Sequence, residues 1–129
     1  MRKVIHPSGA PKPRGPYSPA IVADGFVFVA GQGPVNPKTN ELELGDIQTE
    51  TRRTLENVQA ILKTAGSSLR DVVRVGVFLA DMNDFAAMNE VYREFFPDAP
   101  PARTTVGAQL PKIKVEIDCI ARVPKGRKR

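Results

Sequence analysis

Two charged side chains in this sequence stand where they could do chemistry. Arg103 follows a Pro-Pro-Ala step and opens a short predicted strand, where its guanidinium can offer a bidentate fork to a carboxylate or a phosphate. Glu116 lies in the middle of a β-branched run, and a carboxylate drawn out of water there can orient or activate a water molecule. Spacing alone favours a simpler interpretation of both: a paired surface arginine and an exposed strand carboxylate.

Other candidate residues carry weaker signals. Tyr17 lies in a proline-flanked loop, where it could form the wall of a pocket or pack on the core. The Gly-Gln-Gly step that begins at Gly31 is similar to a phosphate-binding loop, but it opens no helix and no lysine follows it. Thr105 is two residues from Arg103, so the two side chains share one face of the strand.

The single cysteine and the single histidine exclude several classes of site. Cys119 has no partner for an intramolecular disulfide or for a multi-cysteine metal site, and it falls on a buried alternation, which predicts a core residue. His6 has no second ligand or acid nearby, so we do not expect it to be catalytic. A Ser-His-Asp triad would have to include His6, and nothing in the sequence places His6 in one.

Periodicity predicts the elements that position these residues. Asp24-Gly25 between two apolar runs is typical of a hairpin turn. An apolar stripe at spacings of three and four predicts a long helix, which Asp46 can cap and Gly66 can end. The expected strands cover residues 21–23, 26–30, 72–79, 102–106 and 115–123, and the expected helices cover residues 46–65 and 81–96.

This order of elements predicts an α+β fold. Each helix follows a strand and precedes another, which favours a mixed sheet with two helices packed on one face. In the last strand the odd-numbered positions from 115 to 123 face the core, and Glu116 faces the opposite side. Phe26, Phe28 and Phe78 are also expected on that opposite face. A face of this kind often packs against other subunits.

Length and composition indicate one soluble domain over residues 1–129. Apolar residues make up 41% of the chain and charged residues 26%, which is ordinary for a globular protein. No apolar run approaches the ~20 residues of a membrane helix, and the first residues lack the apolar core of a signal peptide. A cytoplasmic protein is therefore the expectation.

The net charge of +5 comes from the ends of the chain. Residues 1–14 and 123–129 hold eight of the nineteen basic residues and no acidic residue, which leaves the middle with a net charge of −3. Short basic tails can contact nucleic acid or an anionic membrane. We favour the simpler interpretation, in which segments 1–14 and 124–129 are solvated, frayed ends.

Several stretches taken together resemble the RidA/YjgF family of imine deaminases. No single stretch is specific, but their joint order and spacing cover nearly the whole chain. They are Gly15-Pro16-Tyr17-Ser18, FVAGQGP at 28–34, NPKT at 36–39, LENV at 55–58, FLADMNDFAAMNEVYREFF at 78–96, PARTTV at 101–106, LPK at 110–112 and VEI at 115–117.

The resemblance implies a chorismate-mutase-like fold and a homotrimer. Three subunits would join their sheets into a central barrel with the helices outside, and three active sites would lie in the clefts between subunits. This assembly would explain how a polar strand face could be partly buried.

The resemblance also implies a reaction, the hydrolysis of a reactive 2-imino acid or its enamine tautomer, such as 2-iminobutanoate or 2-iminopropanoate, to a 2-oxo acid and ammonia. Arg103 matches the arginine that holds the substrate carboxylate, and Glu116 matches the glutamate that positions the attacking water. Tyr17 matches an aromatic wall of the site. Gly31 and Thr105 would present backbone groups toward the imine nitrogen. Neither a metal nor an organic cofactor is required.

The chain departs from the family pattern at four positions, which bear on substrate preference more than on reaction type. Thr105 stands where cysteine is frequent, so a thiol has no role there. Ala30 lacks a frequent hydroxyl, Gly33 replaces an apolar residue and would enlarge or loosen the site, and Pro19 replaces a glutamine.

Two other functions remain open at this point. An RNA-acting protein, either an endoribonuclease or a translation inhibitor, could use the basic tails. It lacks the paired histidines that a metal-free ribonuclease generally needs, and nucleic-acid binding is disfavoured because no aromatic-basic stacking surface is visible. A metabolite-binding or chaperone-like protein could use the same cleft without turnover.

Overall fold

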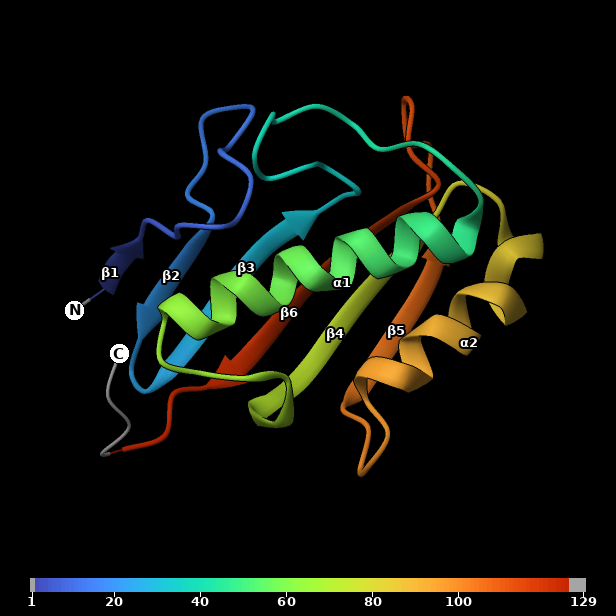
Figure 1. Ribbon diagram of the computed structural model, residues 1–129. Helices are drawn as coiled ribbons and strands as arrows, with labels where there is room; N and C mark the ends of the chain where they lie inside the picture. Colours follow the sequence, from blue (N-terminus) through green and yellow to red (C-terminus); the bar gives the residue numbers. More distant parts are fainter. Residues whose placement is uncertain (1, 126–129) are drawn as a thin grey trace.

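Six strands form one sheet in the computed structural model, which describes residues 2–125. The strands are β1 (Arg2–Ile5), β2 (Ala20–Ala23), β3 (Phe26–Gln32), β4 (Val72–Leu79), β5 (Ala102–Gly107) and β6 (Val115–Arg122). The helices α1 (Ile47–Thr64) and α2 (Phe85–Phe95) lie side by side across one face of the sheet (Figure 1). Short 3-10 turns, η1 (Leu69–Asp71) and η2 (Met82–Asp84), precede β4 and α2.

The strand order is β1-β2-β3-β6-β4-β5. β4 and β5 are parallel and are connected through α2, and all other neighbouring strands are antiparallel. The predicted α+β fold, a mixed sheet with two helices on one face, is confirmed. β5 forms an edge of the sheet, and no helix or strand of residues 2–125 lies on the face opposite the helices (Figure 1).

Local signals placed the first hairpin and the first helix correctly. Asp24 and Gly25 have φ values of 52° and 82°, the positive values that a type I′ hairpin turn requires. The Asp46 carboxylate accepts a hydrogen bond from the backbone N–H of Thr49 at 2.8 Å and so caps α1. Gly66 follows the helix at a φ of 81° and ends it, as predicted.

The second helix begins later than predicted. The carboxylate of Asp81 accepts a hydrogen bond from the backbone N–H of Asn83 at 2.9 Å, and this local bond holds residues 82–84 in a 3-10 turn. The α-helix therefore starts at Phe85. Met88 and Tyr92 of this helix are buried, whereas Phe85 remains exposed beside β5 residue Arg103.

The core lies between the helices and one face of the sheet. Every odd position of the last strand, from Val115 to Val123, is buried, and Cys119 is a core residue as predicted. Glu116 lies on the opposite face, which we call the open face. Phe26 and Phe28 are exposed there, as the alternation indicated.

The N-terminal segment differs from the expectation of a frayed end. Residues 2–5 form β1 and pair with β2, and Ile5 joins the core. Because β1 covers the edge that β2 would otherwise expose, the segment is part of the sheet. The predicted tail at 124–129 lies for the most part outside the described residues. Within residues 2–125, neither helix has the length and apolar character needed to cross a membrane.

Two buried threonines of α1 offer a test of the packing. Thr51 and Thr54 are fully buried, and neither hydroxyl has a hydrogen-bond partner among the described residues. We expect Thr51→Val to raise the free energy of unfolding by roughly 1 kcal/mol, because it removes an unsatisfied polar atom at nearly constant shape.

Thr64→Val is the matched control in urea unfolding. The Thr64 hydroxyl donates to the carbonyl oxygen of Ala60 at 3.2 Å, so this variant should gain nothing. If Thr51→Val is no more stable than Thr64→Val relative to the unaltered protein, the description of the α1 interface is contradicted.

Candidate functional site

Glu116 packs directly on the backbone of Gly31 at the open face. A Cβ atom added to Gly31 would lie 2.9 Å from Cδ of Glu116 and closer still to its Oε2, so a side chain at this position would displace the carboxylate. The ladder between β3 and β6 is irregular between Val29 and Gln32, and this irregularity brings Gly31 to the carboxylate. The sequence alone did not indicate this contact.

A cavity of about 240 Å³ opens beside Glu116. Three loops form its walls, at residues 11–19, 31–35 and 111–113. Tyr17 and Gly31 line it together with Glu116. The Tyr17 hydroxyl accepts a hydrogen bond from the backbone N–H of Arg14 at 3.2 Å, which fixes the ring at the mouth of the cavity. Three of the predicted site residues are therefore neighbours in one chain.

The environment of Glu116 disfavours its charged form. Burial raises the pKa of the Glu116 carboxyl group above its ordinary value, and the nearby negative charge of Asp118 raises it further. Asp118 lies two residues along the same face of β6 and accepts a hydrogen bond from the backbone N–H of Gly76 at 3.1 Å. A carboxylate whose pKa is raised is a stronger proton acceptor than an ordinary glutamate, which suits it to proton transfer.

Arg103 and Thr105 lie elsewhere in the same chain. They pair with the buried Val75 and Val77 of β4, so their side chains point to the helix face, whereas Glu116 points to the open face. The expectation that residues 103 and 105 share a face is confirmed. One chain does not bring Arg103 to Glu116.

The Arg103 guanidinium is held by aromatic rings. Its Cζ atom lies 4.6 Å from the ring centroid of Tyr92 and 5.6 Å from that of Phe85. Such cation–π contacts restrain the side chain and leave the N–H groups free to bind an anion. The buried Thr105 hydroxyl has no hydrogen-bond partner among residues 2–125. The edge strand β5 therefore carries a restrained cation, beside a buried hydroxyl.

Two buried polar residues of α1 hold the loops of the cavity. The Asn57 side-chain amide donates to the carbonyl oxygens of Gly33 at 3.1 Å and Val35 at 2.8 Å. The Glu50 carboxylate accepts from the backbone N–H of Lys114 at 2.7 Å and that of Gly45 at 3.2 Å. Sequence analysis assigned these residues no role. Their signal was a polar side chain on the apolar stripe of a helix, repeated after seven residues.

Ile113 fills the space beside Gly33. A Cβ atom at residue 33 would lie 3.0 Å from Cδ1 of Ile113. The glycine therefore admits an isoleucine from the facing loop, and the expected enlargement of the site at this position is offset.

Burial raises the pKa of the Cys119 thiol to about 12, so the thiol is neutral and outside the site chemistry. Within the described part of the chain, no three histidine, cysteine, aspartate or glutamate side chains are grouped as metal ligands.

Asn57→Ala tests the role of α1 in shaping the cavity. The variant removes the side-chain donor from the buried carbonyl oxygen of Val35 and one of the two hydrogen bonds to that of Gly33, so we expect a loss of roughly 1–3 kcal/mol in the free energy of unfolding. Hydrogen exchange should accelerate in residues 31–35 more than in β4. Asn83→Ala, at an exposed position before α2, is the control. Uniform acceleration across the sheet would contradict a local role.

The fold and the site together are those of a small α+β protein with a cavity at one end of the open sheet face. The sequence model of the Endoribonuclease L-PSP family matches residues 7–123. The chain therefore belongs to this family, which is the RidA/YjgF family that its motifs resemble.

Individual relatives match along most of their length. A RutC family protein of Pyrococcus horikoshii is 55% identical over 123 residues, which cover 94% of this chain and 98% of the relative. A 2-iminobutanoate/2-iminopropanoate deaminase of Dermatophagoides farinae is 41% identical over 121 residues, 92% of this chain and 94% of the relative. The crystal structure of TdcF from E. coli with bound serine superposes with a TM-score of 0.87 at 42% identity, covering 93% of this chain and 98% of that one.

Proposed function

We propose that the protein hydrolyses reactive 2-imino acids to 2-oxo acids and ammonia. The observation that carries this proposal is the Glu116 carboxylate, which rests on Gly31 at the wall of a cavity and has a raised pKa. A relative of 41% identity is named as a 2-iminobutanoate/2-iminopropanoate deaminase, which supports the reaction class. TdcF was crystallised with serine, an amino acid similar in size to these imines.

The complete site needs Arg103 from a second copy of the chain. In one chain Arg103 and Glu116 face opposite sides of the sheet, and β5 has a free edge. The exposed Phe26 and Phe28 give the open face an apolar surface for self-association. These features support a homotrimer with its three sites between subunits.

In the proposed reaction Arg103 holds the substrate carboxylate in a bidentate pair, and Glu116 orients a water molecule toward the imine carbon. The water oxygen forms a bond to that carbon while Glu116 takes a water proton. Glu116 then returns the proton to nitrogen, which gives a 2-amino-2-hydroxy acid. The hydroxyl proton of this adduct passes through Glu116 to the nitrogen as the C–N bond breaks, so that ammonia leaves and the carbonyl forms. Backbone groups at Gly31 and Thr105 face the nitrogen, and Tyr17 covers the substrate. Imine and water supply all the atoms of the products, so the reaction needs no cofactor as a source of atoms or electrons.

An RNA-cleaving function ranks second because the name of the matching family model includes an endoribonuclease. Its acid–base requirement is not met by the residues that line the cavity, among which Glu116 is the only carboxylate and no histidine is present. A protein that binds a metabolite without turnover could use the same cavity. The activity assay below distinguishes this function from imine hydrolysis.

Variants of the two charged residues test the reaction. We expect Arg103→Lys and Glu116→Gln each to lower kcat/KM for 2-iminopropanoate by about 10²–10⁴-fold, since each removes substrate orientation or proton transfer. The imine is generated in situ by an amino-acid oxidase with catalase, and release of the 2-oxo acid is followed.

Arg52→Lys is the matched control, because Arg52 pairs with Glu94 on the helix surface at 2.9 Å. Wild-type protein that is folded and associated but accelerates no imine would refute the proposed reaction. Tight ligand binding without product would favour the metabolite-binding function.

The pH profile tests the Glu116–Asp118 pair. Glu116 must be ionised to accept a proton, so kcat/KM should fall as the pH falls through its raised pKa. Asp118→Asn removes the neighbouring negative charge but keeps an oxygen for the Gly76 N–H. The acid limb of the profile should therefore move to lower pH. An unchanged limb would show that Asp118 does not act on the titrating group.

A further inference from the structure

The cavity beside Glu116 carries more positive charge than a monocarboxylate substrate needs. Three cationic residues line it, Lys12, Arg14 and Lys112, against the single carboxylate of Glu116. None of the three is in an ion pair, because the ion pairs of the described residues join Arg52 to Glu94, Arg53 to Glu56 and Lys114 to Glu50. We call Lys12, Arg14 and Lys112 the cationic rim.

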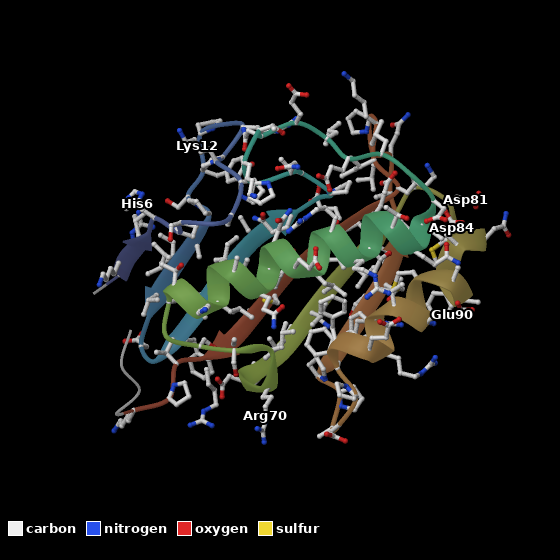
Figure 2. The ribbon with its side chains drawn as sticks, viewed as in Figure 1. His6, Lys12, Arg70, Asp81, Asp84 and Glu90 are labelled. Carbon is white, nitrogen blue, oxygen red and sulfur yellow. The ribbon has the colours of Figure 1, made fainter. Side chains whose placement is uncertain are left out.

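Backbone contacts fix one side of the rim. The backbone N–H of Lys12 donates to Oδ1 of Asn40 at 2.9 Å, and the Arg14 guanidinium donates to the carbonyl oxygen of Asn40. Asn40 adopts a φ of 61° at the end of its turn. The loop before β2 is thus fastened to the loop after β3, which fixes the backbone of Lys12 and the guanidinium of Arg14 at this end of the sheet. Figure 2 shows Lys12 on this loop.

Among the residues that line the cavity, Glu116 is the only acidic one beside the cationic rim. Glu43 accepts a hydrogen bond from the Asn36 amide at 2.5 Å and does not line the cavity. In Figure 2 the labelled Asp81, Asp84 and Glu90 gather around α2, well apart from Lys12. A cleft with an excess of one charge concentrates ligands of the opposite charge and speeds their association.

We propose that the preferred substrates are 2-imino dicarboxylic acids of four or five carbons. This inference rests on the proposed function and names its substrate class. The 1-carboxylate binds Arg103 from the second copy, and the distal carboxylate binds the cationic rim. The chemistry at the imine carbon is unchanged: water adds, the C–N bond breaks, and 2-iminosuccinate with water gives oxaloacetate and ammonia.

Paired imines test this specificity. 2-Iminosuccinate is generated from aspartate and 2-iminopropanoate from alanine by the matching oxidases, with catalase present. A coupled dehydrogenase follows the release of oxaloacetate or pyruvate. We expect wild-type kcat/KM to be higher for 2-iminosuccinate, and this preference to weaken as salt screens the rim.

Rim variants should act on the ratio of the two rates. Arg14→Gln with Lys112→Gln should lower the ratio of kcat/KM for 2-iminosuccinate to that for 2-iminopropanoate on the order of tenfold. The control is Lys38→Gln with Lys63→Gln, which removes two exposed lysines that do not line the cavity. Lys112→Gln alone, in a residue with no described side-chain bond, provides the test if the Arg14 change disturbs folding.

Two results would overturn the inference. Equal or better hydrolysis of 2-iminopropanoate, with a ratio that the rim variants do not change, would reject the dicarboxylate class and leave the proposed reaction intact. Absence of acceleration for either imine, from folded protein, would reject both. A ratio that falls equally in the lysine control would assign the effect to net charge and also reject the rim.

Discussion

The hydrogen bonds that Glu50 and Asn57 make across the interface of α1 hold the site in shape. Both side chains are fully buried, where an unpaired carboxylate or amide would cost several kcal/mol. Their partners are backbone groups of the loops at residues 33–35 and 45 and of Lys114 at the start of β6. A helix whose buried face were wholly apolar would pack on the sheet equally well and leave those loops without fixed positions.

Two glycines on the open face make room for the acidic side chains of β6. Gly31 leaves room for the Glu116 carboxylate, and Gly76 leaves room for that of Asp118 while its N–H binds the carboxylate. Two acidic residues at alternate positions of one strand therefore lie against bare backbone. Burial, together with the negative charge of Asp118, raises the pKa of the Glu116 carboxyl group above its ordinary value.

Patterns within one element were enough to predict most of the fold. The Asp24-Gly25 turn, the stripe of α1 and the alternation of β6 each depend on neighbours in sequence, and each was found correctly. β1 was missed because a four-residue edge strand with two basic residues has no periodic signal, and its stability comes from pairing with β2. The site was predicted less completely. Arg103, Glu116 and Tyr17 were selected as residues, but the separation of Arg103 from Glu116 follows from strand order, which no local pattern specifies.

The buried thiol of Cys119 gives the folded protein a practical property. Its pKa of about 12 and its place in the core keep it neutral and out of reach of thiol reagents. The native chain therefore behaves as a cysteine-free protein, although its sequence contains a cysteine. A fluorophore can be attached to a cysteine introduced at exposed Lys38 without prior removal of the natural one. Any labelling of the unaltered chain reports the fraction of molecules that have opened their core.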